Sequence, residues 1–210
     1  MLPPTRNCLI CFKEIKLNDM CRILNEKIPI CRTCQNEMRP KFIKFKAEGH
    51  NATSIYDYNP FIKKLIYQYK GCYDYELNKA FISMFAKEIK LRYSSYVVIP
   101  VPSYKKEDEE RGFNHVVEIY KNLGLTMLEI LEKTEKHKQA TSTVNSRHNV
   151  YKYLALNSRP DLRKKKVLLV DDVYTTGSTM KSAINLVEKL NPKRIEVLVI
   201  AKTKPKQTPK

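Results

Sequence analysis

Residues 167–179 read Val167-Leu168-Leu169-Val170-Asp171-Asp172-Val173-Tyr174-Thr175-Thr176-Gly177-Ser178-Thr179, and this run indicates the fold class of the chain. It begins with four consecutive apolar residues, which is typical of a strand buried on both faces. Two acids end the predicted strand 167–170, a short turn follows, and a helix is predicted over 178–190. A strand, a turn and a helix in this order predict an α/β domain, whose ligands bind at the carboxyl ends of its strands.

The turn after the two acids has the groups that bind a phosphate. Gly177 permits a positive φ and a close approach of the backbone to a ligand. The start of the following helix adds free N–H groups and a positive dipole end. Asp171 and Asp172 would repel a phosphate, but they suit a vicinal ribose diol, either directly or through Mg²⁺. The alternative is an ordinary strand-to-helix turn in which Ser and Thr only cap the helix. It would explain the hydroxyls but not the two adjacent acids before them. The hydroxyls belong to Thr175, Thr176, Ser178 and Thr179.

Other nucleotide and catalytic motifs are absent from the sequence. It has no Gly-x-x-x-x-Gly-Lys-Ser/Thr run, and its five glycines do not form Gly-x-Gly-x-x-Gly. It also lacks the Gly-x-Ser-x-Gly elbow of hydrolases. A P-loop, a dinucleotide-binding fold and a serine hydrolase are therefore excluded.

Outward from this run, short apolar strands alternate with helices. Such alternation predicts a mostly parallel sheet that is covered by helices on both faces. The polar segment 133–150 is expected to be a long mobile loop. Strands are predicted at 53–59, 96–101, 127–131 and 195–200, and helices at 61–69 (opened by Pro60), 76–92 and 115–123.

Four cysteines near the amino terminus form two Cys-x-x-Cys pairs. The pairs are Cys8 with Cys11 and Cys31 with Cys34, and their spacing is that of a structural zinc site. Four thiolates leave no ligand position for a catalytic water, so the expected Zn²⁺ is structural. Disulfides are the alternative, which a reducing compartment disfavours. Cys72 is expected to be an ordinary buried thiol.

These features divide the chain into three predicted parts. Residues 1–40 are expected to form the zinc-binding module, whose folding depends on the metal because it has few large apolar side chains. Residues 41–203 are expected to form the α/β domain. Residues 204–210, which alternate Lys with Pro, are expected to be a disordered basic tail.

The charge of the chain is strongly positive. Its 210 residues include 39 Lys and Arg against 22 Asp and Glu, a formal charge of +17. An excess of this size favours polyanionic partners, of which nucleic acid is the usual one. No apolar run is long enough to cross a bilayer, and the start lacks the apolar stretch of a signal peptide. We therefore expect a cytoplasmic protein without membrane insertion.

The run 167–179 resembles the signature of type I phosphoribosyltransferases, and the whole chain resembles the ComF (ComFC) family of competence-associated proteins. The resemblance implies the type I fold and a site for 5-phosphoribosyl pyrophosphate with Mg²⁺. It also implies a cytoplasmic role in natural transformation, acting on single-stranded DNA with other competence proteins such as a DNA-translocating ATPase. The matching motifs are the two cysteine pairs, Lys70-Gly71, Ile99-Pro100-Val101-Pro102 and Arg111-Gly112-Phe113-Asn114.

The resemblance also implies roles for single residues. The loop Val101-Pro102-Ser103 would receive the pyrophosphate, and Arg111 would reach a phosphate with its forked guanidinium. Asp171 and Asp172 would act with Arg111 as the catalytic set. His115 stands where family members often carry Gln, and the segment 139–149 follows the family's Gln-and-Arg loop only loosely.

Three functions fit these observations. The first is a DNA-handling competence protein, for which the aromatic residues interleaved with lysines at 56–75 offer surfaces that stack on bases. The alternative explanation of these aromatic residues is an amphipathic helix that faces the core with Phe61, Leu65 and Tyr69. The second is an active phosphoribosyltransferase, although the sequence shows no residues that recognise a base. The third is a sensor in which phosphoribosyl pyrophosphate controls another binding event.

Overall fold

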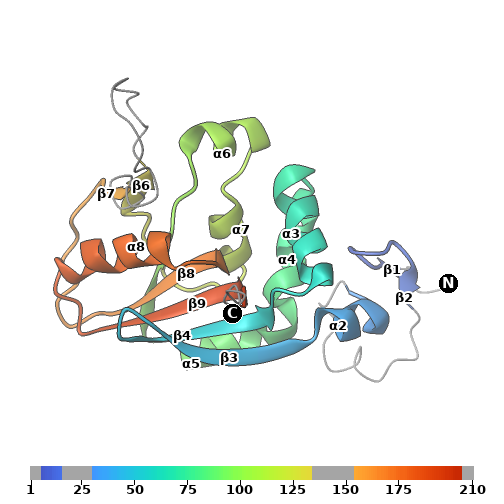
Figure 1. Cartoon of the computed structure of the whole chain (residues 1–210), viewed down its shortest axis with the longest axis horizontal. Helices are drawn as coiled ribbons and strands as arrows, with labels where there is room; N and C mark the ends of the chain where they lie inside the picture. The colour runs from blue at the N-terminus through green and yellow to red at the C-terminus, as the bar shows by residue number, and fades with distance from the viewer. Residues whose placement is uncertain (1–5, 16–29, 134–153, 205–210) are drawn as a thin grey trace, which may run out of the picture.

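A computed structural model describes residues 6–15, 30–133 and 154–204 of the chain. Its centre is a five-stranded sheet with the strand order β3-β4-β9-β8-β5 (Figure 1). Strands β4, β9, β8 and β5 run parallel, and β3 pairs with β4 in the antiparallel direction at one edge. The predicted mostly parallel sheet is therefore confirmed. Its strands are β3 (Pro40–Ala47), β4 (His50–Asp57), β5 (Tyr96–Pro100), β8 (Lys166–Tyr174) and β9 (Arg194–Lys202).

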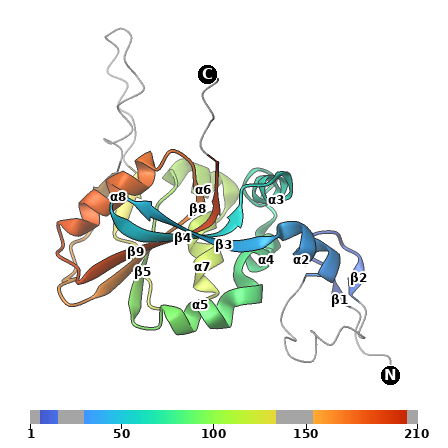
Figure 2. The same cartoon turned by 60° about the horizontal axis from the view of Figure 1, so that its bottom comes forward.

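Alternate residues of the central strands enter two separate cores. On β8, Leu168 and Val170 pack into one core, whereas Val167 and Leu169 pack into the other. Helix α8 (Ser178–Glu188) covers the second core. The first core is covered by α3 (Pro60–Gly71), α4 (Asn78–Ile82), α5 (Ala86–Arg92) and α7 (His115–Lys121). Figure 2 shows α8 and α5 on opposite sides of the sheet, and burial on both sides explains the unbroken apolar run of β8.

The edge strand β3 is not among the predicted strands. Lys41, Lys44 and Lys46 are exposed on it, and Ala47 is its one buried residue. Ile43, Phe45 and Ala47 are half-buried or buried between the exposed lysines, so the strand has a short period-2 alternation that the predicted strands did not include. Lysines on such an edge also discourage pairing with a further strand.

Helix α3 begins and ends where the sequence predicts. The Asn59 side chain accepts a hydrogen bond from the Ile62 N–H at 2.8 Å, and Pro60 occupies the first helical turn, where its missing N–H costs nothing. Leu65 and Tyr69 are buried, as the amphipathic pattern predicts. The predicted strands 53–59, 96–101, 167–170 and 195–200 and the helices 115–123 and 178–190 also agree with the structure to within a few residues.

The predicted continuous helix 76–92 is wrong. The chain instead forms η1 (Tyr75–Leu77), α4, η2 (Ser83–Phe85) and α5 in succession. The apolar residues of this segment recur every fourth position, whereas an α-helix has 3.6 residues per turn. A straight helix would rotate the later ones away from the core. The chain instead breaks the helix at Ile82 and Phe85, whose φ values of −123° and −124° are not helical, and Leu77, Phe81 and Ile89 are all buried.

The predicted strand 127–131 is also wrong in its position. Met127 forms only an isolated bridge with Val98, and the strand β6 (Leu131–Lys133) pairs with β7 (Leu154–Leu156). Most of the predicted mobile loop 133–150 lies outside the described residues. Helix α6 (Lys105–Arg111) is not predicted, because none of its residues is buried and it has no apolar period.

The amino-terminal residues pack against the core of the α/β domain. They form the strands β1 (Arg6–Asn7) and β2 (Glu14–Ile15) and the helix α2 (Arg32–Met38). Cys8, Cys34 and Met38 are buried in the same cluster as residues of α3 and α4. The boundaries 1–40, 41–203 and 204–210 remain predictions, and the predicted tail beyond Lys204 lies outside the described residues. Within the described ranges, no helix is both long enough and apolar enough to cross a membrane.

Candidate functional site

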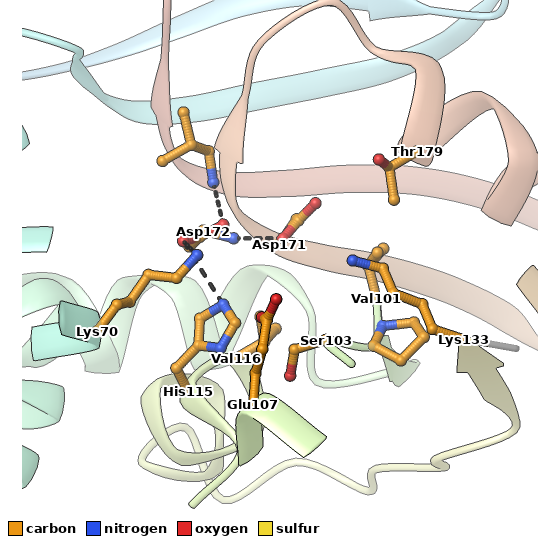
Figure 3. Close-up of a pocket in the computed structure, with 12 residues that line it drawn as sticks. Lys70, Val101, Ser103, Glu107, His115, Val116, Lys133, Asp171, Asp172 and Thr179 are labelled. Carbon is orange, nitrogen blue, oxygen red and sulfur yellow. Dashed lines mark hydrogen bonds and ion pairs between the residues drawn. The ribbon is translucent and has the colours of Figure 1, made fainter. Parts of the chain in front are cut away.

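The carboxyl ends of β5 and β8 meet at a polar cavity of about 160 Å³ (Figure 3). The two strands are parallel neighbours, and the Val101 N–H donates to the Val170 carbonyl at 2.9 Å where they end. Of the predicted site residues, Pro102, Ser103, Asp171, Asp172 and Thr179 line the cavity. Arg111, Thr175, Thr176, Gly177 and Ser178 do not belong to its lining. Lining residues that the sequence did not assign to the site include Lys70, Glu107, His115 and Lys133.

Asp172 is buried and ion-paired. Its Oδ2 lies 2.8 Å from Nζ of Lys70 and 3.6 Å from Nε2 of His115. Its Oδ1 accepts a hydrogen bond from the Val173 N–H at 2.7 Å. Burial alone would raise the pKa of Asp172, but the neighbouring Lys70 and His115 hold this pKa at about 2. The Asp172 carboxylate is therefore ionised and already paired with a cation.

Asp171 differs from its neighbour. Its Oδ1 accepts the Asp172 N–H at 2.8 Å, but no Lys or Arg of the described residues forms an ion pair with it. Burial and the negative charge of Asp172 raise the pKa of Asp171 well above its usual range. A carboxylate in this state gains from a cation or a hydroxyl donor. The hydroxyls of Ser103 and Thr179 line the same cavity, and such hard oxygen donors fit Mg²⁺.

His115 is held as the neutral imidazole with its proton on Nε2. Arg111 Nη1 lies 3.2 Å from Nδ1 of His115, and because a guanidinium can only donate, Nδ1 is the acceptor. The protonated Nε2 then faces Asp172. Burial lowers the pKa of His115 to about 3, with Lys70 and Arg111 adding to this effect and Asp172 opposing it. In this tautomer His115 presents one N–H to the carboxylate, as a Gln amide would.

Arg111 supports the cavity from behind. Its side chain is only 6% exposed, and its Nη1 donates to Oδ1 of Asp108 at 2.9 Å. Its Nε donates to the Lys70 carbonyl at 3.2 Å. Asp108, which the sequence analysis missed, also accepts hydrogen bonds from the Ser103 hydroxyl and from the Asn114 amide. The guanidinium therefore orients Lys70 and His115, and its predicted contact with a phosphate remains a prediction.

The turn 175–178 joins β8 to α8 through a left-handed glycine. Gly177 has a φ of +80°, and a Cβ at this position would collide with the Tyr174 hydroxyl. The hydroxyls of Thr176 and Ser178 lie 3.0 Å apart, and Thr175 and Thr176 are exposed. Helix α8 starts directly after Gly177, so its first N–H groups face the turn. The predicted positive φ of Gly177 is confirmed, and the close approach of its backbone to a ligand remains a prediction.

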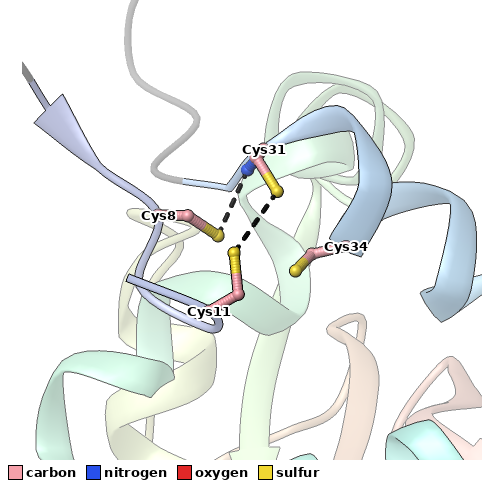
Figure 4. A group of neighbouring side chains, drawn as sticks. All are labelled: Cys8, Cys11, Cys31 and Cys34. Carbon is pink, nitrogen blue, oxygen red and sulfur yellow. Dashed lines mark hydrogen bonds between the residues drawn. The ribbon is translucent and has the colours of Figure 1, made fainter. Parts of the chain in front are cut away.

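The four paired cysteines lie together beside α2 (Figure 4). Their Sγ atoms are all within 4.8 Å of one another, and those of Cys11 and Cys31 are 3.6 Å apart. Zn–S bonds of about 2.3 Å in a tetrahedron put the sulfurs about 3.8 Å apart, so the cluster fits a zinc ion. All four are free thiols rather than disulfides. The expected burial of Cys72 is wrong, because this residue follows the end of α3 and is exposed.

Comparisons with known proteins agree with this geometry. The family model of the phosphoribosyl transferase domain matches residues 109–210. Competence protein ComFC of Streptococcus pneumoniae is 29% identical over 154 residues, which cover 73% of this chain and 69% of that protein. Competence protein ComFC of Bacillus subtilis is 26% identical over 195 residues, which cover 89% of this chain and 80% of that protein. An adenine phosphoribosyltransferase of Bacteroides fragilis is 55% identical over 38 residues, 18% of this chain and 21% of that protein.

Solved structures similar to this chain include two phosphoribosyltransferases. A purine phosphoribosyltransferase of Pyrococcus horikoshii has a TM-score of 0.40 and 24% identity, over 60% of this chain and 73% of that one. An adenine phosphoribosyltransferase of Thermoanaerobacter pseudethanolicus has a TM-score of 0.41 and 16% identity, over 80% of this chain and 99% of that one. The chain is therefore similar to the ComFC competence proteins over most of its length, and it has a phosphoribosyltransferase-like domain beside a four-cysteine cluster.

Proposed function

We propose that this chain binds a ligand of the 5-phosphoribosyl pyrophosphate type in the cavity and handles incoming single-stranded DNA in the cytoplasm during natural transformation. The observation that carries the ligand proposal is the Asp171 carboxylate, which lies in the second half of β8 and forms no ion pair with a Lys or Arg among the described side chains. Similarity to the ComFC competence proteins supports the role in transformation.

Each part of the proposed ligand has a matching group in the protein. The turn 175–179 would hold the terminal phosphate through backbone N–H groups and hydroxyls. Asp171 would accept hydrogen bonds from the ribose diol, and Ser103 with Lys133 would face the pyrophosphate. When bound, Mg²⁺ would neutralise part of the pyrophosphate charge. The structural metal of the proposed complex is Zn²⁺ on the four cysteines.

Calorimetric titration with Mg²⁺ and 5-phosphoribosyl pyrophosphate tests the ligand site. We expect the wild type to bind and the double variant Asp171→Asn/Asp172→Asn to lose binding. Asp161→Asn, which removes an exposed carboxylate that does not line the cavity, is the matched control and should bind like the wild type. Absence of binding to the wild type would refute the ligand proposal and leave the DNA role resting on charge and similarity to the competence proteins.

The outer side of α3 supports the DNA role. Leu65 and Tyr69 face the core, but Tyr67 points outward and is 66% exposed. Tyr58, Lys63, Ile66, Tyr67, Lys70 and Gly71 line a shallow apolar groove beside it. Tyrosines among lysines can stack bases while the ammonium groups contact phosphates. One side of α3 therefore packs against the core, and the other side carries this groove.

Binding of labelled single-stranded DNA at several salt concentrations tests this role. We expect affinity to fall steeply with salt, because phosphate contacts release counterions. Tyr67→Ala should weaken binding by about 1–3 kcal/mol, the usual contribution of one stacked base. Leu91→Ala, which truncates an exposed apolar residue on α5, is the control. No binding at low salt would exclude this role.

We also propose that the protein acts with other competence proteins, such as a DNA-translocating ATPase.

A phosphoribosyltransferase activity is the second candidate, and the short adenine phosphoribosyltransferase match favours it. Release of pyrophosphate from 5-phosphoribosyl pyrophosphate in the presence of candidate bases would establish it. No release from any member of a broad panel of bases would count against turnover.

A sensor role is favoured by Lys70, which lines both the cavity and the apolar groove on the outer side of α3. A ligand that changes the position of Lys70 would also change the groove. We then expect 5-phosphoribosyl pyrophosphate to alter the affinity for single-stranded DNA, and DNA to alter the affinity for the ligand by the same factor. Independent affinities would exclude the sensor.

A further inference from the structure

Lys70 forms an ion pair with one of the two adjacent aspartates in the cavity and leaves the other without one. Its Nζ lies 2.8 Å from Oδ2 of Asp172. Asp171 lines the same cavity, and the described part of the chain places no Lys or Arg in an ion pair with it. Lys70 thus pairs with one of the two adjacent acids, while Lys133, a described residue that also lines the cavity, forms no ion pair with either.

The position of Lys70 is set by the backbone as well as by its charge. Lys70 stands in the last turn of α3, and its carbonyl accepts a hydrogen bond from Nε of Arg111 at 3.2 Å. Arg111 is itself held by Asp108 at 2.9 Å. The Lys70 side chain is 34% exposed and that of Asp172 is 10% exposed. The ammonium therefore lies at the mouth of the cavity, between Asp172 and solvent.

We infer that Lys70 keeps divalent cations off Asp172, because its ammonium takes the position that a metal ion would have on this carboxylate. Protein sites for Mg²⁺ use one or two carboxylates together with phosphates of the ligand. With Asp172 paired to Lys70, Asp171 is the one carboxylate of the pair that can ligate a metal. The metal is then held mainly by the phosphates with which it arrives. This inference rests on the proposed ligand site and specifies which of the two adjacent carboxylates is open to its metal.

Titration with Mn²⁺ alone tests the role of Lys70 without any enzymatic assay. Full-length, zinc-saturated protein is used at about pH 8, where a released carboxylate would be ionised, and electron paramagnetic resonance reports free Mn²⁺. We expect weak binding to the wild type. Lys70→Met should bind Mn²⁺ about tenfold more tightly, because it removes the competing ammonium from Asp172. Adding Asp172→Asn to Lys70→Met should abolish this gain.

Two further variants make the result decisive. Lys70→Gln also removes the charge but keeps a hydrogen-bond donor, so it serves if Lys70→Met does not fold by circular dichroism. Lys64→Met, an exposed lysine on the same helix, should leave the Mn²⁺ affinity unchanged. Unchanged affinity in a folded Lys70→Met or Lys70→Gln would overturn the inference, even if the wild type binds 5-phosphoribosyl pyrophosphate. A gain in Mn²⁺ affinity would support it even if that ligand does not bind.

Discussion

His115 is held between Arg111 and Asp172 in a geometry that suits only the neutral imidazole. The guanidinium donates to Nδ1, so a proton at that atom would meet a donor instead of an acceptor. Burial lowers the pKa of His115 to about 3. The position tolerates a histidine because the environment makes it an uncharged N–H donor.

This geometry predicts a loss of stability in mild acid. Below about pH 6.5 the unfolded chain protonates His115 but the folded chain does not, so unfolding becomes easier as the pH falls toward 3. One pH unit below 6.5 corresponds to about 1.4 kcal/mol. Urea unfolding at about pH 7.5 and pH 5.5 measures this loss. His115→Gln should lose about 1.4 kcal/mol less than the wild type between these two conditions.

The control for this measurement is His50→Gln, a change of the same kind outside the cavity, where His50 contacts Glu188. This variant should lose stability in acid as the wild type does. An equal loss in His115→Gln and the wild type would show that His115 is not the group responsible.

At the scale of elements, the connection between β8 and α8 depends on a backbone shape that one residue makes possible. Gly177 has a φ of +80° and lies directly against Tyr174, whose ring also packs on Phe45 with centroids 4.8 Å apart. A side chain at position 177 would be strained twice, by its backbone and by contact with Tyr174. The same turn begins α8 and shapes the proposed phosphate site.

Comparison of two glycines separates these two causes. Gly49 has a similar φ of +84°, but a Cβ there would meet nothing within 4 Å. Gly49→Ala should therefore cost only about 1 kcal/mol for the backbone. Gly177→Ala should cost about 1–3 kcal/mol more, because Tyr174 has to move. Urea unfolding of both variants gives the difference, and equal costs would contradict the close contact with Tyr174. Gly177→Ala should also weaken ligand binding.

At the scale of the whole molecule, the cysteine cluster and the α/β domain share one core. Cys8, Cys34 and Met38 are fully or almost fully buried in the cluster that also contains Ile62 and Phe81. A metal that orders the amino-terminal residues therefore also completes the packing over α3 and α4. The cluster is expected to stabilise the domain and not only its own segment.

Removal of the metal should lower the melting temperature of the whole protein. We expect Cys34→Ser, or extraction of zinc with a chelator, to shift thermal unfolding down by at least about 5 °C, since each kcal/mol moves the midpoint by about 2–4 °C in a chain of this size. Calorimetry and measurement of bound zinc follow the change. Cys72→Ser, at the exposed cysteine, should keep both the metal and the midpoint. A domain that melts at the same temperature without zinc would argue against a shared core.

The sequence by itself determined the features that depend on neighbouring residues. The unbroken apolar run 167–170 predicted a strand buried on both faces, Pro60 marked the start of α3, and two Cys-x-x-Cys pairs predicted the cluster. The acids at the end of β8 were predicted to lie in a ligand site at the carboxyl edge of the sheet, and they line the cavity there. Each signal is a local pattern of spacing, and such patterns survive without knowledge of the rest of the chain.

Only the tertiary structure decided which of these residues touch. Lys70 and Asp172 are 102 positions apart in the sequence, and Arg111 is 41 positions from the Lys70 carbonyl that it contacts. No periodicity relates such residues, because their meeting depends on how α3, α6 and β8 pack. Because of this packing, Asp172 is ion-paired with Lys70, whereas the adjacent Asp171 is not. It also turns Arg111 toward Asp108, since a buried guanidinium must satisfy its donors within the protein.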